Sequence, residues 1–158
     1  MSEKDRNRAV PAVYLLLRRE HELLLTRRKG TYYDGWYSVP AGHVEAGELP
    51  TDSLIRESAE EIGIVIEADD AKLVHTMYRT KHDETGDRVD LFYRVDSWSG
   101  EITNLEPEKC DDIRWFAIDE LPERLMHHVG RAIVAIENRV SSSELDLNDI
   151  TPNPTTRN

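Results

Sequence analysis

Cysteine, long apolar runs and positive charge are all scarce in this sequence, and each shortage excludes a class of protein. The single cysteine, Cys110, cannot form an internal disulfide, which fits a reducing compartment. The longest apolar run, Ala9–Leu17, is much too short to span a membrane and is better explained as a buried strand. The first residues also lack the basic-then-apolar pattern of a secretion leader. We therefore expect a cytoplasmic protein that is not inserted in a membrane.

Acidic residues outnumber basic ones, 31 Asp and Glu against 20 Lys and Arg, which gives a formal net charge of −11. Such a surface repels nucleic acid polymers and anionic membranes, so we expect neither as a partner. A small phosphorylated molecule is still compatible with this charge where local cations or metal ions screen it. The sequence contains neither the G-x-S-x-G motif of serine hydrolases nor a Walker phosphate-binding loop, so both of those enzyme classes are excluded.

The apolar pattern predicts one domain over residues 8–140, between flexible termini at 1–7 and 141–158. Polar residues and prolines dominate the second terminus, which is typical of a mobile tail. Within the domain, runs of apolar or alternating residues predict strands around Val13–Leu17, Leu23–Leu25, 72–81, 88–98 and 112–118. Segment 30–43 is rich in glycine, proline and aromatic residues, so we expect a loop with short extended pieces.

Two helices are predicted. Pro50 suits a first helical position and Gly63 suits a stop, which indicates a helix over Pro50–Ile62, although Leu49 is a poor N-cap. Apolar residues at helical spacing predict a second helix over Leu121–Val140. Long antiparallel runs of strands with two helices indicate an α+β protein, arranged as an α/β/α sandwich around a mixed sheet.

The first predicted helix gathers three glutamates on one face. At ~100° per residue, Glu60 and Glu61 both lie within about 60° of Glu57. The opposite side, which would pack against the sheet, carries Ile55, Ala59 and Ile62. Like charges at this spacing destabilise a helix by some tenths of a kcal/mol per pair, roughly. Magnesium binds a few carboxylates together with waters and phosphate oxygens, so it would relieve the repulsion. Taken alone, the cluster is explained as well by a solvated acidic face.

The residues around the cluster favour the metal site, because they occur at fixed intervals: Gly42, Glu48, Arg56-Glu57, Glu60-Glu61, Gly63 and Ile64. This spacing closely resembles the signature of the Nudix hydrolase family, G-x5-E-x7-R-E-U-x-E-E-x-G-U, in which U is bulky and aliphatic. The one departure is Ser58, where the family has an aliphatic residue, and that position holds no ligand. The resemblance implies the Nudix fold over about residues 8–140.

The resemblance also implies hydrolysis of a nucleoside diphosphate linked to another group, with Mg²⁺ or Mn²⁺ as the cofactor. On the family pattern the metal ligands are Glu57, Glu60, Glu61 and the backbone carbonyl of Gly42. Glu57 is in addition the candidate base that accepts a proton from the attacking water.

Further acidic and basic residues have expected roles in the same resemblance. Arg56 would orient a metal-binding carboxylate through a charge-assisted hydrogen bond, with Glu48 as its partner. Glu106 or Glu108, in the loop before the last predicted strand, would supply an additional ligand or base, since the family often recruits one from such a loop. A homodimer is compatible with the family, although the sequence shows no dimer surface.

Residues outside the motif are expected to bind the substrate. Arg27 and Arg28 close a predicted strand and are candidates for phosphate contacts, or else form an ordinary solvated strand end. Trp36 lies in an aromatic loop and could stack on a base. The segment DDIRWF resembles the one with which oxidised-purine triphosphatases of the family read a base, and it contributes Asp111, Asp112 and Trp115. Trp115 could equally fill the core. Weaker cationic candidates are Arg79, Lys81 and Arg88.

The histidines receive no functional role from the sequence. His127 and His128 lie near the start of the last helix with no carboxylate at H-E-x-x-H spacing. His43 adjoins Gly42, but a loop histidine is usually structural or solvated.

The sequence therefore predicts a Mg²⁺-dependent pyrophosphohydrolase. The leading substrate is a nucleoside triphosphate, intact or oxidised, cleaved to the monophosphate and pyrophosphate. Alternatives in the same class are ADP-ribose, a nucleotide sugar or a dinucleotide. A non-catalytic nucleotide-binding Nudix module is disfavoured, because such modules typically lose carboxylates that this helix keeps. A purely structural acidic domain would show no metal-dependent change in stability.

Overall fold

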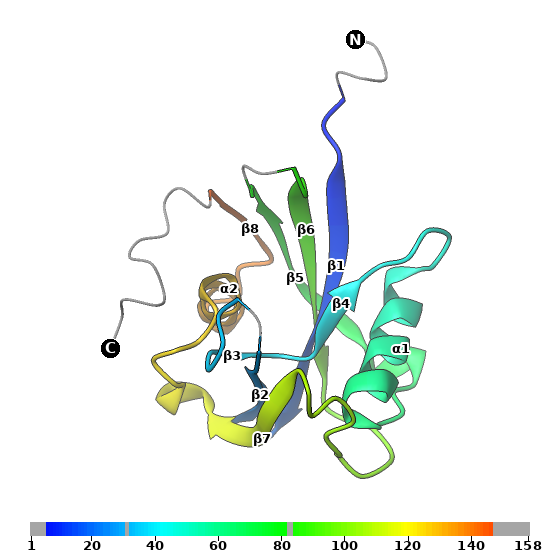
Figure 1. Ribbon diagram of the computed structural model, residues 1–158, viewed down its shortest axis with the longest axis vertical. Coiled ribbons are helices and arrows are strands. Elements are labelled where there is room, and N and C mark those ends of the chain that lie inside the picture. Colours follow the sequence, from blue (N-terminus) through cyan, green and yellow to red (C-terminus); the bar gives the residue numbers. More distant parts are fainter. Residues whose placement is uncertain (1–5, 31, 82–83, 147–158) are drawn as a thin grey trace.

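The computed structural model describes residues 6–30, 32–81 and 84–146. Along the chain lie β1 (Ala9–Arg19), β2 (Glu22–Arg28), β3 (Tyr37–Ser38), β4 (Ala41–His43), α1 (Pro50–Ile62), the 3-10 turn η2 (Ala68–Asp70), β5 (Lys72–Arg79), β6 (Asp87–Val95), β7 (Cys110–Ala117), the 3-10 turn η3 (Ile118–Glu120), α2 (His127–Glu137) and β8 (Ser142–Leu145) (Figure 1). Within the described ranges, no helix has the length and apolar character needed to cross a membrane.

The strands form one mixed sheet in the order β3-β2-β1-β6-β5-β8, with β4 beside β1 and β7 beside β2. The central strand is β1, which runs parallel to β6 over Ala9–Leu17 and antiparallel to β4 over Ala12–Tyr14. Its last residues pair with β2, so β1 belongs to both halves of the sheet. This position brings β4, which contains Gly42, close to the middle of the molecule.

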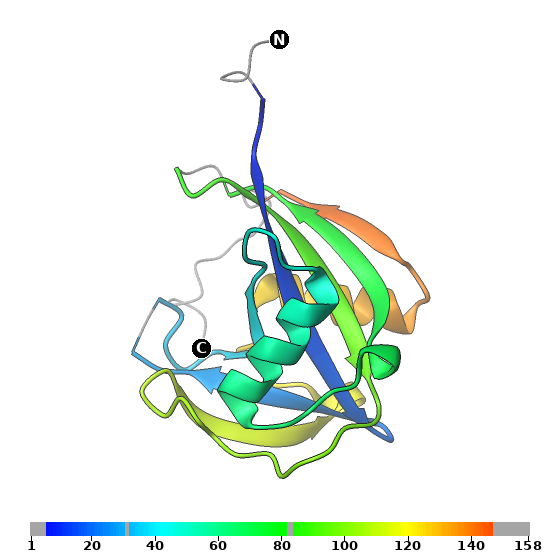
Figure 2. The same cartoon turned by 90° about the vertical axis from the view of Figure 1, so that its right-hand side faces the viewer.

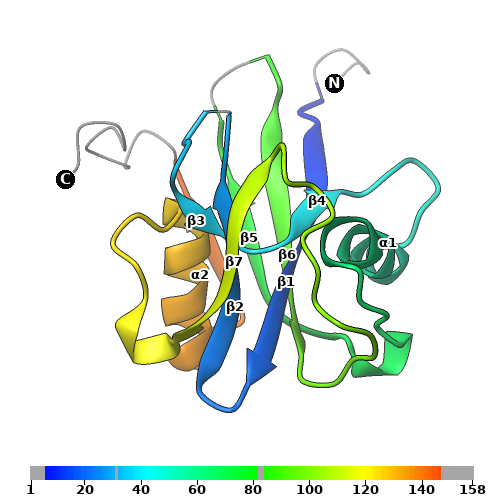
Figure 3. The ribbon, with the colours of Figure 1, turned by 60° about the horizontal axis from the view of Figure 1, so that its bottom comes forward.

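Alternation along β1 divides the core into two layers. Val13, Leu15 and Leu17 pack with α1 on one face of the sheet. Tyr14 and Leu16 pack with α2 on the other face. Figures 2 and 3 show the two helices on opposite sides of the sheet. The predicted α/β/α sandwich and the mixed sheet are confirmed.

Helix α1 begins and ends where the sequence predicts. Gly63 adopts the left-handed φ of 72° and its N–H bonds to the carbonyl of Ala59, which closes the helix. Of the three residues predicted to pack against the sheet, Ile62 is buried and Ile55 packs partly against the core, but Ala59 is exposed and Ser58 is buried in its place. The buried side is formed by Leu54, Ser58 and Ile62 at steps of four residues. Ser58 fits there because its hydroxyl donates to the Leu54 carbonyl at 2.7 Å.

The second helix is shorter than the predicted Leu121–Val140, since it occupies only His127–Glu137. The missing first turns pair with β3 instead. The N–H of Tyr37 donates to the carbonyl of Arg124 at 2.7 Å, and the N–H of Met126 donates to the carbonyl of Tyr37 at 2.9 Å. The proline in this segment also favours extended backbone in the residue before it.

The expectation of a flexible tail from residue 141 is wrong for Ser142–Leu145, which forms β8 parallel to β5. Leu145 is buried there. The ring of His75 in β5 holds β8 and the residues before it by two hydrogen bonds. Its nitrogens lie 2.8 Å from the Val140 carbonyl and 2.7 Å from the Ser143 hydroxyl. Residues 1–5 and 147–158, which make up most of the two predicted termini, lie outside the described residues.

Candidate active site

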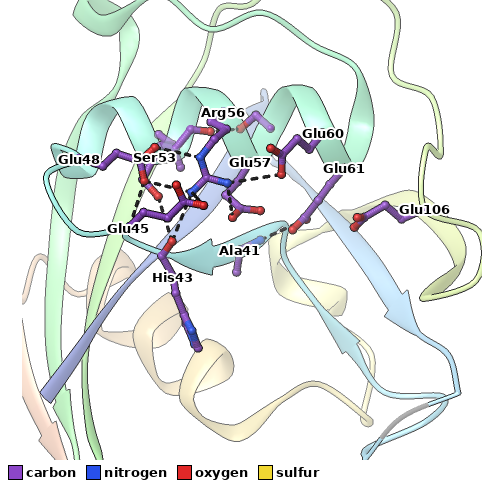
Figure 4. Close-up of polar contacts among 12 residues, drawn as sticks. Ala41, His43, Glu45, Glu48, Ser53, Arg56, Glu57, Glu60, Glu61 and Glu106 are labelled. Carbon is purple, nitrogen blue, oxygen red and sulfur yellow. Dashed lines mark hydrogen bonds and ion pairs between the residues drawn. The ribbon is translucent and has the colours of Figure 1, made fainter.

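The guanidinium of Arg56 lies at the centre of the acidic face of α1 (Figure 4). Its Nε and Nη2 donate to the two carboxylate oxygens of Glu48 at 2.9 and 3.0 Å, which confirms the expected pair. Its Nη1 donates to Glu57 at 2.9 Å and to Glu60 at 3.4 Å. The hydrogen bonds from Arg56 lower the pKa of Glu48 to about 2, so Glu48 is ionised in the folded protein.

Strand β4 brings Gly42 against the carboxylate of Glu57. A Cβ atom at position 42 would overlap the Glu57 carboxyl carbon and oxygen, so any side chain there would displace the glutamate. The φ angle of Gly42 is not positive, so close approach is the reason for glycine here. Arg56 also donates to the His43 carbonyl at 3.4 Å, which fastens α1 to β4. The backbone of β4 and the acidic face of α1 therefore meet at Gly42.

Glu61 completes this acidic group from the last turn of α1. Its Oε2 accepts a hydrogen bond from the Ala41 N–H at 3.3 Å. Burial, followed by the negative charges of Glu57 and Glu106, raises the pKa of Glu61 to about 9. Figure 4 shows Glu106 approaching Glu61 from the loop before β7. A nearby divalent cation would reverse this shift, because its charge favours the ionised carboxylate.

These residues have the donor chemistry of a Mg²⁺ or Mn²⁺ site, since carboxylate and carbonyl oxygens are the preferred ligands of both ions. As the side chains lie, no three His, Cys, Asp or Glu groups among the described residues are spaced to hold one ion. Arg56 donates hydrogen bonds to Glu57 and Glu60, and Glu57 also lies close enough to Glu61 to raise its pKa. The donor set therefore fits a divalent cation, whose charge would relieve the repulsion between Glu57 and Glu61.

A cavity of about 330 Å³ opens beside this acidic group. Glu61 and Glu106 line one end of it, next to Gly42. Tyr14 of β1 and His128 of α2 line it as well, on the side of the sheet that α2 covers. A space of this size suits a small organic ligand or one part of a dinucleotide.

Of the residues predicted to bind substrate, Arg27 and Arg28 line the cavity. The two aspartates predicted beside them do not. Asp111 pairs with Arg27 at 2.6 Å. Asp112 bonds to the Tyr37 hydroxyl and to Arg114, away from the lining. The cavity therefore does not support the predicted pair of base-reading aspartates; the pairing of β7 with β2 is irregular here, with Cys110 opposite Arg28 and Asp112 opposite Arg27.

The two tryptophans predicted as base platforms do not line the cavity either, and both are corrections. Trp36 is 2% exposed, and its ring lies 5.6 Å from that of His127, so it offers no open face. Trp115 stacks on Trp98, with ring centres 5.9 Å apart, and the guanidinium of Arg19 covers it at 4.3 Å. The structure gives Trp115 the core role that the sequence left open.

Sequence reasoning missed Tyr14 and His128. Tyr14 stands in an apolar run and reads as a core residue, while His128 has no partner at recognisable spacing. Only the pairing of β1 with β4 and the packing of α2 bring both to the cavity. The sequence did point to the loop before β7, where two glutamates were predicted to reach the site. Of these, Glu106 lines the cavity and Glu108 does not.

Known proteins resemble this chain along most of its length. The family model of the NUDIX domain matches residues 6–135. NAD-capped RNA hydrolase NudC of Stutzerimonas stutzeri is 34% identical over 115 residues, which cover 73% of this chain and 39% of that protein. ADP-ribose pyrophosphatase of Methanocaldococcus jannaschii is 25% identical over 120 residues, 75% of this chain and 69% of that protein. The chain thus spans about two fifths of the length of the NudC relatives that it matches.

Solved structures share the fold. The crystal structure of a MutT NUDIX hydrolase from Burkholderia pseudomallei aligns with a TM-score of 0.74 at 28% identity, covering 80% of this chain and 97% of that one. A MutT/nudix family protein from Enterococcus faecalis aligns with a TM-score of 0.70 at 20% identity, covering 89% and 65%. Since the domain match spans most of the sequence and the motif glutamate Glu57 lies against the motif glycine Gly42, the chain belongs to the Nudix family.

Proposed function

We propose that this chain is a pyrophosphohydrolase that uses Mg²⁺ or Mn²⁺ to cleave the phosphoanhydride bond of a nucleoside diphosphate linked to another group. One observation carries the proposal: Glu57, Glu61 and Glu106 face one another beside Gly42, at one end of the cavity. Mutual repulsion makes such a group unfavourable without a cation. A cation held there would be placed to meet a diphosphate bound in the cavity.

Each motif residue has a distinct part in this proposal. When bound, a divalent cation would neutralise the phosphates and lower the pKa of the attacking water. Arg56 is a positioning residue that orients Glu57 and Glu60, and Glu48 fixes Arg56 in turn. The groups that would hold the cation are Glu57, Glu60, Glu61 and the carbonyl of Gly42.

The reaction requires a base and a place for the departing phosphate. The water oxygen bonds to one phosphorus while the bond from that phosphorus to the bridging oxygen breaks, and the water proton passes to a carboxylate. Glu57 and Glu106 are the two candidates for this base, because both face Glu61. Arg27 and Arg28 line the cavity and would balance the negative charge of the phosphates.

The substrate that we propose is an ADP-linked compound such as ADP-ribose or NAD. The relatives named above are an NAD-capped RNA hydrolase and an ADP-ribose pyrophosphatase. The sequence favoured a nucleoside triphosphate, intact or oxidised, but the residues expected to read an oxidised base, Asp112 and Trp115, do not line the cavity. The net charge of −11 favours the free dinucleotide over a capped RNA chain.

A substrate panel with product identification tests the proposal. ADP-ribose, NAD, an NAD-capped RNA, a UDP-sugar, dGTP and its 8-oxo form would each be incubated with the protein and Mg²⁺. We expect AMP from ADP-ribose or NAD at rates well above those for the triphosphates. Faster release of pyrophosphate from the triphosphates would contradict the proposed substrate. Tight nucleotide binding with no turnover in Mg²⁺ or Mn²⁺ would contradict the enzyme.

A further inference from the structure

His128 is a buried polar side chain that lines the cavity and that the motif chemistry leaves unexplained. It is the second residue of α2, and its side chain is 9% exposed. Among the described residues, its ring nitrogens make no hydrogen bond. Neither ring nitrogen is among the fully buried unpaired atoms of the described residues, so both nitrogens are accessible from the cavity. The open side of the ring is the cavity itself.

The ring of His128 is held in place from behind. Tyr14 meets it edge to face, with ring centres 5.4 Å apart and planes at 77°. Tyr14 in turn stacks on Phe92 at 4.5 Å, and its hydroxyl accepts a hydrogen bond from Arg79 at 3.3 Å. Arg79 is fixed by an ion pair with the fully buried Asp90 at 2.8 Å. This chain of contacts orients the imidazole before any ligand arrives.

The surroundings also keep the ring uncharged. Burial, followed by the positive charges of Arg79, Lys81 and Arg28, holds the pKa of His128 well below its ordinary value. A neutral imidazole offers one N–H donor and one acceptor nitrogen. The nearby positive charges favour an electron-rich ligand atom beside the ring. The Glu61 end of the cavity carries negative charge instead.

We propose that His128 is a specificity-determining residue, whose ring N–H donates a hydrogen bond to an uncharged oxygen in the part of the substrate remote from the diphosphate. The inference rests on the proposed function, because it takes the diphosphate to lie at the Glu61 end. The cavity joins both groups, so one molecule can contact them together. In an ADP-linked substrate this oxygen is a sugar hydroxyl, because adenine carries no carbonyl.

A matched pair of substrates tests this hydrogen bond: ADP-ribose and the ADP ester of cyclopentylmethanol, which lacks the hydroxyls of the second sugar. We expect the wild type to prefer ADP-ribose about ten-fold in kcat/KM, mainly through KM. No preference in the wild type would overturn the inference.

Three variants assign that preference to the imidazole. His128→Phe removes both nitrogens and should abolish the preference. His128→Gln retains a donor and should restore part of the preference. His21→Phe, in the exposed turn between β1 and β2, is the matched control and should behave as wild type. The Tm of His128→Phe should not fall, since the imidazole makes no hydrogen bond to another described residue that the substitution would break. An equal loss on every substrate, or full preference in His128→Phe, would overturn the inference.

A spectroscopic measurement separates this inference from the proposed function. The ¹⁵N resonances of the His128 ring would be followed while a methylene-bridged, non-hydrolysable ADP-ribose is added with Mg²⁺. We expect the donor nitrogen to shift on saturation, and the shift to be absent with the analogue that lacks the contacted oxygen. Turnover by the wild type without any such shift overturns the role of His128 alone. Neither turnover nor binding of any panel member overturns the proposed function, and this inference with it.

Discussion

Arg56 and Glu48 are joined by two parallel hydrogen bonds, of 2.9 and 3.0 Å, although Glu48 precedes α1 and Arg56 lies within it. The same guanidinium bonds Glu57 and Glu60 with its third nitrogen. The loop before the helix therefore sets the position of carboxylates on the helix. Residues that never touch the phosphates are expected to affect catalysis through this link.

Replacing Glu48 by glutamine should lower kcat about 10- to 100-fold with little change in KM, because Arg56 loses the anchor that orients Glu57. Glu45→Gln is the matched control, since that carboxylate is exposed and lies 3.8 Å from Arg56. Steady-state kinetics with the best substrate measures both. Equal losses in the two variants would show that charge near Arg56 matters, and not its anchoring.

The same pair predicts a pH dependence of stability. Arg56 lowers the pKa of Glu48 from 4.5 to about 2 in the folded protein, so the unfolded chain binds a proton at this site more readily. The stabilisation is therefore complete above pH 4.5 and is lost as the pH falls toward 2. The urea unfolding curves of wild type and Glu48→Gln should converge over this interval. Curves that stay parallel would contradict the shift.

Replacing Glu61 by glutamine should reduce metal-dependent turnover by about three orders of magnitude, since a charged ligand is lost without a change in shape. In the metal-free protein the same substitution should instead be favourable, because it should raise the stability. Glu61 has a pKa raised from 4.5 to about 9, so the wild type loses stability as the pH rises through this interval.

Thermal unfolding in EDTA across this pH range measures the effect. Glu61→Gln should lack this part of the slope and should be the more stable protein at pH 8. Added Mg²⁺ should raise the Tm of the wild type and change that of the variant much less. Identical slopes in the two proteins would show that Glu61 does not carry the buried proton.

Replacing Gly42 by alanine should cost about 100-fold in kcat, because the new methyl group displaces the Glu57 carboxylate. Gly130→Ala is the control, since a Cβ there meets only Leu125 at an ordinary 3.6 Å and alanine favours the helix by roughly 1 kcal/mol. Kinetics and urea unfolding distinguish the two. A fully active Gly42→Ala would show that Glu57 need not lie against β4.

Glu106→Gln should lower kcat more than Glu108→Gln, since Glu106 lines the cavity and faces Glu61 while Glu108 does not line it. Removal of the Glu106 charge should also bring the pKa of Glu61 closer to its ordinary value. The pH profile of kcat and the EDTA unfolding series report these two effects. A larger loss in Glu108→Gln would contradict the assignment.

Leu145→Ala tests strand β8, which the sequence did not predict. Leu145 is 4% exposed and belongs to the core cluster between the sheet and α2. Its truncation should therefore lower the free energy of unfolding by about 2–4 kcal/mol. Glu144→Ala, on the exposed side of the same strand, should change it little. Urea denaturation measures both. No difference between the variants would mean that this segment is a tail after all.

Features fixed by neighbouring residues could be predicted from the sequence. Helix α1 begins at Pro50 and ends at Ile62 because a proline and a glycine bound it. The paired hydrogen bonds between Arg56 and Glu48 follow from the places of these residues in the motif. The strands β1 and β2 follow from their apolar runs.

Features that depend on distant pairing could not be predicted. Whether Asp112 faces the cavity depends on the register of β7 against β2, and no local pattern encodes that register. The burial of Trp36 and the position of His128 depend on where α2 packs. The shortened α2 has the same origin, because its expected first turns pair with β3 across the chain.

The most direct test of the metal site is an anomalous difference map at the manganese edge, from crystals soaked in Mn²⁺ and a methylene-bridged ADP-ribose. The account predicts a peak among the carboxylates of Glu57, Glu60 and Glu61, next to Gly42 and in contact with the diphosphate. A manganese peak elsewhere, or a bound diphosphate with no peak beside these residues, would contradict it.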